Sequence, residues 1–81
     1  MITSNLDTGG VWVEILNPFS ISNASNAEVE VWIGTVAPLA TSIGHLLNRG
    51  DGLTLDMFDA GDRLWVKTRV GTGTVTITSR A

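Results

Sequence analysis

The sequence contains no cysteine and no tyrosine, and it contains one histidine, His45. The absence of cysteine excludes disulfides and thiolate metal sites, and one histidine excludes a site with several histidine ligands. A chain of 81 residues is expected to form one domain and to bury only roughly 60% of the surface that its unfolded form exposes. Small domains usually compensate through disulfides, metals or oligomerisation. Oligomerisation is therefore the route that the composition leaves open, although well-packed domains of this size also fold alone.

Basic residues are also few, with five Lys and Arg against eight Asp and Glu and a net charge of −3. Nucleic-acid binding usually needs a basic face, so nucleic acid is not an expected partner. No apolar run reaches the roughly 20 residues of a membrane-spanning helix. The N-terminal segment lacks the basic start and apolar stretch of a secretory signal. We therefore expect no membrane partner, and a chain that is made and kept in the cytosol or is a fragment or mature form.

The sequence shows no pattern that supplies catalytic chemistry. His45 has no serine or acid beside it in a recognisable motif. The aspartates between residues 51 and 62 do not follow the EF-hand spacing, and aspartate beside glycine is ordinary turn chemistry. No helix is expected after Gly71-Thr72-Gly73, so this segment is not a phosphate loop. The sequence thus predicts no enzyme, no catalytic residue, no cofactor and no metal.

Two short motifs have simpler explanations than the functions they suggest. Arg49-Gly50-Asp51 matches an integrin-binding tripeptide, but three residues recur easily by chance and a turn is the favoured interpretation. Asn23-Ala24-Ser25 is a glycosylation sequon, which carries little weight without a secretion signal.

Alternation of β-branched and polar residues predicts strands along most of the chain. The clearest alternation runs over residues 28–35, where Val29, Val31 and Ile33 fall on one face. The other predicted strands cover residues 11–16, 19–22, 45–47, 53–58, 63–70 and 74–79, and the last two are expected to form a hairpin. Within residues 36–49 a short helix is the alternative, but the β-rich remainder of the chain favours a loop followed by a strand.

Six or seven short strands separated by turn signals predict an all-β fold, a small jelly-roll-like β-sandwich or barrel. Residues 11–81 are expected to form this single β domain. Residues 1–10 are polar and end in two glycines, which predicts a flexible N-terminal arm. Such an arm either frays or reaches onto a neighbouring molecule.

Three tryptophans fall on the polar side of their strands, opposite the aliphatic residues. One interpretation is that they cover an outer face beneath charged side chains. The other is that they form a contact surface that is buried only in an assembly, since tryptophan and arginine are enriched in interfaces. The candidate interface residues are Trp12, Trp32, Arg63, Trp65 and Lys67.

The charges sort by strand, with acidic residues on the first two strands and basic residues on a later one. Glu14, Glu28 and Glu30 lie on predicted outer faces, as do the basic residues between 63 and 69. If these strands are neighbours, the charges pair within one chain, with about 1 kcal/mol per pair at most. If they are not, an acidic and a basic patch suit head-to-tail contact between subunits. In-chain pairing is favoured because the strands are few.

Three segments carry a family resemblance: residues 46–55 (LLNRGDGLTL), 61–67 (GDRLWVK) and 71–77 (GTGTVTI). They resemble the endings of small virion proteins of tailed bacteriophages, in which an acidic glycine turn, a Leu-Trp strand and a glycine-threonine hairpin follow one another. Residues 11–17 and 29–34 also suit this pattern, so the likeness covers about three quarters of the chain. The matched positions are structural, so no functional residue is transferred.

The resemblance implies an all-β virion structural protein, foremost a capsid decoration (cement) protein. Such proteins often form trimers that brace neighbouring capsid subunits, which implies copies of itself and the major capsid protein as partners. The implied location is the virion, assembled in the host cytoplasm. A neck, tail or fibre component and a small carbohydrate- or receptor-binding β module are the alternatives.

Overall fold

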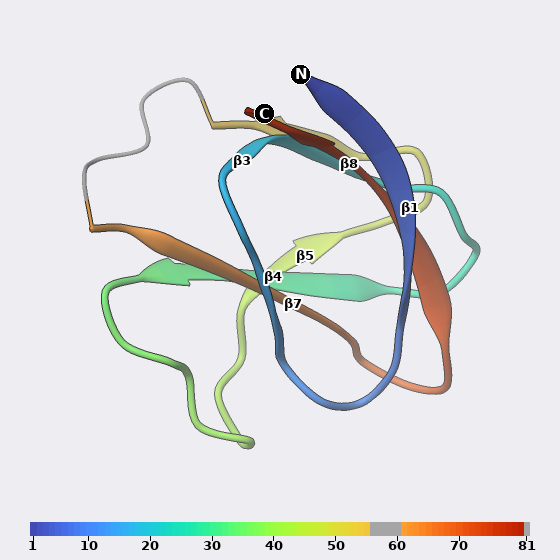
Figure 1. Ribbon diagram of the computed structural model, residues 1–81. Helices are drawn as coiled ribbons and strands as arrows, with labels where there is room; N and C mark the ends of the chain where they lie inside the picture. The colour runs from blue at the N-terminus through green and yellow to red at the C-terminus, as the bar shows by residue number, and fades with distance from the viewer. Residues whose placement is uncertain (56–60, 81) are drawn as a thin grey trace.

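Short alternating segments give this chain two antiparallel sheets of four strands each (Figure 1). The computed structural model describes residues 1–55 and 61–80, and all statements below concern these residues. In chain order the strands are β1 (Ile2–Thr8), β2 (Val13–Ile15), β3 (Pro18–Asn23), β4 (Val29–Gly34), β5 (His45–Leu47), β6 (Gly52–Thr54), β7 (Arg63–Thr68) and β8 (Gly73–Ser79). One sheet has the order β1-β8-β3-β6 and the other the order β2-β7-β4-β5.

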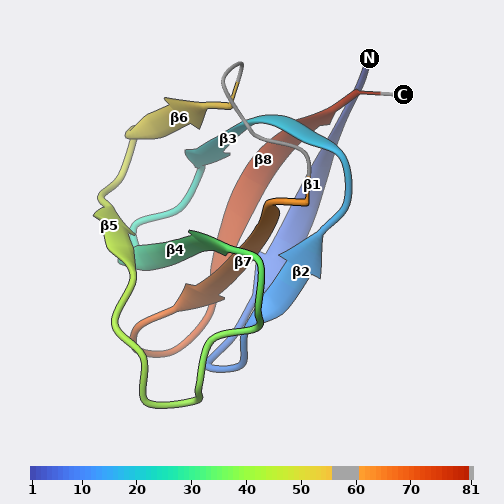
Figure 2. The same cartoon turned by 90° about the vertical axis from the view of Figure 1, so that its left-hand side faces the viewer.

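The two sheets pack face to face, as Figure 2 shows, and their inner faces form the core. Ile21 of β3 lies opposite Ile77 of β8, and Val31 of β4 lies opposite Val66 of β7. Every second residue along a strand faces the same side of the sheet, so these pairs line the space between the two sheets. The buried core consists of Ile15, Ile21, Val29, Val31, Leu47, Leu55, Leu64, Val66, Val75 and Ile77. The predicted all-β sandwich is confirmed, with eight strands in the described residues rather than six or seven.

The N-terminal segment differs from the expected arm, because most of it is strand β1. Residues Ile2–Thr8 pair with β8 in seven consecutive positions. Their even-numbered side chains face the core, where Leu6 packs against the buried cluster and Thr8 bonds to Thr68 of the other sheet through their hydroxyls. The sequence of β1 is polar because the strand lies at a sheet edge, and its pairing partner is distant in sequence. Neither fact is visible in the local pattern.

The predicted hairpin of residues 63–70 and 74–79 is wrong, since β7 and β8 belong to different sheets. β7 ends at Thr68 and the chain crosses to the other sheet through residues 69–72. Val70, at the end of the strand predicted over residues 63–70, lies outside β7 and is exposed. Each strand contributes aliphatic side chains to the core between the two sheets, Leu64 and Val66 from β7 and Val75 and Ile77 from β8.

The segment between β4 and β6 follows the favoured prediction of a loop and a short strand. His45–Leu47 is strand β5, which pairs with β4, and no helix occurs among the described residues. The strand predicted over residues 53–58 is observed as β6, Gly52–Thr54. Its predicted continuation over residues 56–58 lies outside the described residues.

Asn23, at the end of β3, ties together segments that no strand pairing joins. Its side-chain amide donates to the carbonyls of Ala27 and Leu47 at 2.7 and 2.9 Å, and its Oδ1 accepts from Ser25 N and Oγ at 2.9 Å each. Asn23 is only 2% exposed. The Nδ2 atom that glycosylation would modify is therefore buried and fully used, so the folded chain does not present this sequon.

We predict that Asn23→Ala lowers the free energy of unfolding by about 1–3 kcal/mol, because it leaves buried carbonyl and amide groups without partners. Asn26→Ala, an exposed position in the same loop, is the matched control and should change stability by no more than about 0.5 kcal/mol. Urea unfolding followed by tryptophan fluorescence measures both. Equal stability of the two variants would contradict the role assigned to Asn23.

Candidate binding face

The three tryptophans gather on the outer face of the sheet β2-β7-β4-β5, which we call the tryptophan face. Trp65 of β7 lies opposite both Trp32 of β4 and Glu14 of β2 in the strand registers. Trp12, just before β2, meets the ring of Trp32 edge-on, with centroids 6.4 Å apart and planes at 64°. Edge-to-face contact at this distance is a favourable aromatic geometry. The sequence therefore placed the tryptophans on the correct side of the sheet.

Arg63 closes one end of the tryptophan face by pairing with Glu14. Its Nε and Nη2 donate to the two carboxylate oxygens of Glu14 at 2.8 Å each, and its guanidinium lies 4.7 Å from the centroid of the Trp65 ring. The hydrogen bond from Arg63 and its positive charge hold the pKa of Glu14 below its ordinary value. The in-chain pairing of the acidic and basic strands is thus confirmed here, because β2 and β7 are neighbours.

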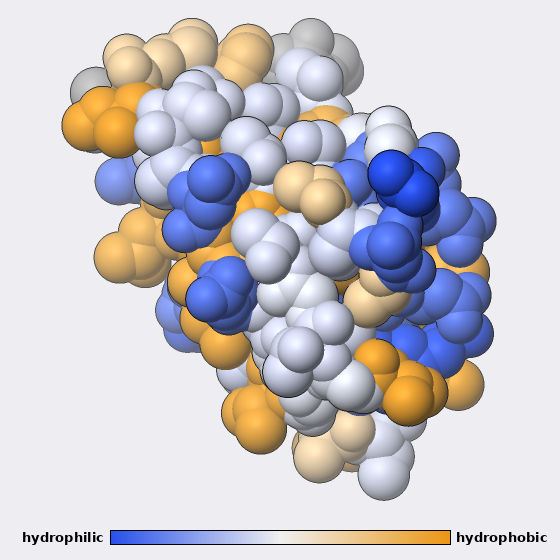
Figure 3. Space-filling model, turned by 90° about the vertical axis from the view of Figure 1, so that its right-hand side faces the viewer, coloured by the Kyte–Doolittle hydropathy of each residue, from blue (hydrophilic) through white to orange (hydrophobic). Residues whose placement is uncertain are grey.

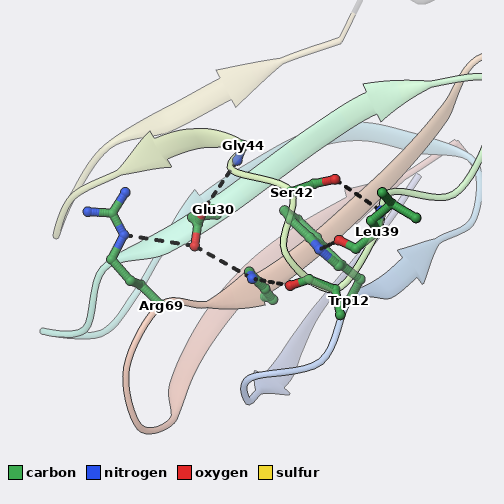
Figure 4. Close-up of polar contacts among 8 residues, drawn as sticks. Trp12, Glu30, Leu39, Ser42, Gly44 and Arg69 are labelled. Carbon is green, nitrogen blue, oxygen red and sulfur yellow. Dashed lines mark hydrogen bonds and ion pairs between the residues drawn. The ribbon is translucent and has the colours of Figure 1, made fainter.

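Glu30 of β4 forms the centre of a second charge group. The side chain points to the outer face, yet Glu30 is only 3% exposed. Its Oε1 accepts from the backbone N–H of Gly44 at 3.0 Å, and its Oε2 lies 4.0 Å from Lys67 Nζ and 3.8 Å from Arg69 Nε (Figure 4). A buried carboxylate needs such partners, since burying an unpaired charge is very unfavourable. Glu30 therefore links β7 to the chain segment that follows β4.

That segment, residues 35–44, is the β4–β5 loop, and it is fastened onto the tryptophan face. Trp12 Nε1 donates to the carbonyl of Leu39 at 3.1 Å, and Lys67 Nζ contacts the carbonyl of Ala40 at 3.4 Å (Figure 4). The same Lys67 ammonium lies 4.9 Å from the centroid of the Trp12 ring. At the loop's end, a Cβ on Gly44 would clash with the carbonyl oxygen of Val31, so only glycine fits there.

For Trp65, these contacts decide between the two interpretations of the tryptophans. Its side chain is only 4% exposed within the single chain. Its burial needs no partner molecule, because Arg63 and the chain segments over the sheet already cover it. Trp12 and Trp32 are half-buried. Sequence reasoning missed the β4–β5 loop as the covering element. The signal for it was the apolar composition of a segment that fits no strand pattern.

The β4–β5 loop also presents apolar side chains to solvent. Val36, Leu39 and Ile43 are 72%, 73% and 76% exposed. Between the loop and the chain before β2 lies a mostly apolar hollow of about 290 Å³, lined by Gly10, Val11, Trp12, Ala37, Pro38, Ala40 and Trp65. Of the five candidate interface residues, Trp12 and Trp65 line this hollow and Lys67 anchors its loop wall. Arg63 lies at the Glu14 end of the face, and Trp32 contacts the ring of Trp12 edge-on.

The remaining motifs have structural roles or none that the contacts show. Asp51 Oδ2 accepts from Asn48 N at 2.9 Å, and Gly50 has a φ of 83°, so Arg49-Gly50-Asp51 forms part of a tight turn. His45 is exposed. Within residues 1–55 and 61–80, no group of three or more His, Asp or Glu side chains could hold a metal ion. The same residues include no helix that could cross a membrane.

Comparison of the chain with protein-family models, with curated proteins and with solved structures found no match.

The lowered pKa of Glu14 makes a pH-dependent prediction. A carboxyl group whose pKa is lower in the folded than in the unfolded state stabilises the fold above its unfolded pKa, and this contribution disappears as the pH falls. We predict that Arg63→Met raises the pKa of Glu14 to its ordinary range in a carboxyl NMR titration. The stability difference from the unmodified chain should shrink as Glu14 becomes protonated. Arg49→Met, at an exposed turn residue, should leave Glu14 unchanged; an unaltered Glu14 titration in Arg63→Met would contradict the pairing.

Proposed function

We propose that this chain is a structural protein of a tailed-bacteriophage particle, most specifically a capsid decoration protein that stabilises the head by binding between capsid subunits. The β4–β5 loop is the part that contacts those subunits. The sequence resemblance suggests the particle, and the geometry of the loop supports contact with protein.

The observation that carries the proposal is the exposure of Val36, Leu39 and Ile43 on an anchored loop. Other residues of the same loop, Ala37, Pro38 and Ala40, line the mostly apolar hollow. Exposed apolar side chains beside such a hollow are typical of protein contact sites. The loop is fixed by Trp12, Glu30 and Lys67, so it loses little conformational freedom when it binds. A preformed apolar loop of this kind suits binding to a fixed surface such as a capsid.

Carbohydrate binding is less well supported by the same face. A sugar ring needs an open aromatic face to stack on. Trp65 is buried, with the guanidinium of Arg63 placed over its ring. The exposed groups of the loop are instead aliphatic, which favours a protein partner.

The role is tested by locating the chain on particles. Particles are isolated from producing cells by density gradient, and the chain is labelled through an antibody for electron microscopy. We expect label over the whole head surface. When the gene is deleted, we expect the heads to break open on heating or in low salt. Label confined to the neck, tail or fibres, or a chain that never sediments with particles, would overturn the assignment.

The loop's part in binding is tested by charge insertion. We predict that Leu39→Asp and Ile43→Asp each weaken binding of the purified chain to heads that lack it by about tenfold or more, because an apolar contact is replaced by a buried charge. Val70→Asp is the matched control, since Val70 is at least as exposed as the loop residues but lies in the β7–β8 connection. Unfolding temperatures should be similar for all three variants. Equal binding by the loop variants and the control would show that this loop is not the contact.

A further inference from the structure

β1 differs from the other strands that lie at sheet edges. The edge strands β2, β5 and β6 each have three residues, whereas β1 has seven. Among the described residues, β8 is the only strand that pairs with β1, so the opposite side of β1 has no strand partner. An unpaired edge of this length presents a row of backbone N–H and C=O groups that another strand can pair with.

The usual devices that block edge pairing are missing from β1. Its sequence, ITSNLDT, contains no proline and no lysine, and its register with β8 is continuous, without a bulge. Asp7 is its only charged side chain and lies near one end. The other three edges are protected by their shortness, so β1 is the one edge in the described sheets that remains open to association.

The outer surface beside this edge is polar but nearly uncharged. Thr74 and Thr76 of β8 donate to Asp7 and Asn5 of β1, at 3.1 and 3.0 Å. Near the other end, the hydroxyls of Thr3 and Thr78 are 3.0 Å apart. Figure 3 shows this side of the molecule, with side chains of intermediate hydropathy running through the middle of the face. A chain with a net charge of −3 repels its copies least where charge is sparse.

We infer that β1 pairs with β1 of a second copy, antiparallel and about a two-fold axis that passes by Ser4. The two sheets β1-β8-β3-β6 then join into one continuous sheet across the axis. The inference concerns the isolated chain and does not depend on its proposed place on a particle.

This register is self-complementary. With Ser4 facing Ser4 of the second copy, Ile2 faces Leu6 and Thr3 faces Asn5 across the axis. Side-chain direction is preserved, because residues directly opposite each other in an antiparallel pair share a face. Ile2, which is exposed in the single chain, thus gains an apolar neighbour on the core side. Thr3 and Asn5 repeat on the outer side the hydroxyl–amide pairing that Thr76 and Asn5 already make. Asp7 never faces Asp7.

The contact is small. A strand-to-strand edge buries less than the roughly 1,600 Å² of a standard stable interface. We therefore expect a reversible dimer whose population rises with concentration, and which other contacts would strengthen in an assembly.

The absence of cysteine allows a direct test of the axis. We expect Ser4→Cys to form a disulfide-linked dimer under mild oxidation, because two cysteines facing each other across an antiparallel pair lie within disulfide reach. Thr54→Cys is the control, at an exposed position on the short edge β6 of the same sheet. Dimer formation at position 4 and not at position 54 supports the proposal. Equal yields at both positions, or none at position 4, would overturn it.

Association is measured on variants without cysteine by analytical ultracentrifugation and native mass spectrometry. Ser4→Lys places two positive charges opposite each other and should weaken dimerisation by about tenfold or more. Thr54→Lys carries the same charge and should leave it unchanged. Circular dichroism checks that both variants stay folded. A monomer at millimolar concentration, or the trimer that the phage resemblance implies, would overturn the two-fold pairing whatever the chain binds on a particle.

Discussion

The buried carboxylate of Glu30 is the constraint on which the outer half of this structure depends. Its place in β4 between Val29 and Val31, which face the core, puts it on the outer face of the sheet, and a buried carboxylate is stable only with donors around it. Lys67 of the neighbouring strand β7 and Arg69, which follows that strand, supply charge, and the backbone of Gly44 supplies a hydrogen bond. This last contact brings the β4–β5 loop back over the tryptophan face. The loop is placed by an electrostatic requirement as well as by packing.

The two proposed contact surfaces differ in chemistry and belong to different sheets. The β4–β5 loop offers aliphatic side chains on a fixed backbone, over one sheet. The open side of β1 offers backbone hydrogen bonds and small polar side chains, at the edge of the other sheet. Because the surfaces belong to different sheets, a dimer formed through β1 keeps both loops free. A protein that joins its own copies and also binds a larger structure needs this separation, as a decoration protein would.

Local patterning revealed the strands and the faces of their side chains, but not how the strands are paired. Alternation placed Val29, Val31 and Val66 in the core and the tryptophans outside it, as the structure has them. It could not show that β7 and β8 belong to different sheets, because a turn sequence rich in glycine joins strands within a sheet or between sheets. It also could not show β1, whose pairing partner β8 lies at the other end of the chain.

For the candidate site, sequence reasoning found the residue types and missed the element that covers them. The pairing of acidic and basic strands followed from charge sorting, and Glu14 and Arg63 form it. The position of the β4–β5 loop over the tryptophan face depends on the hydrogen bond from the Gly44 N–H to the Glu30 carboxylate, which no local pattern encodes. Hydrogen exchange of the Trp12 indole N–H and the Gly44 amide N–H, followed by NMR, tests this account most directly. We predict that both protons are protected in the unmodified chain and that both lose protection together in Glu30→Ala. Indole exchange as fast as in free tryptophan, or protection unchanged in that variant, would contradict it.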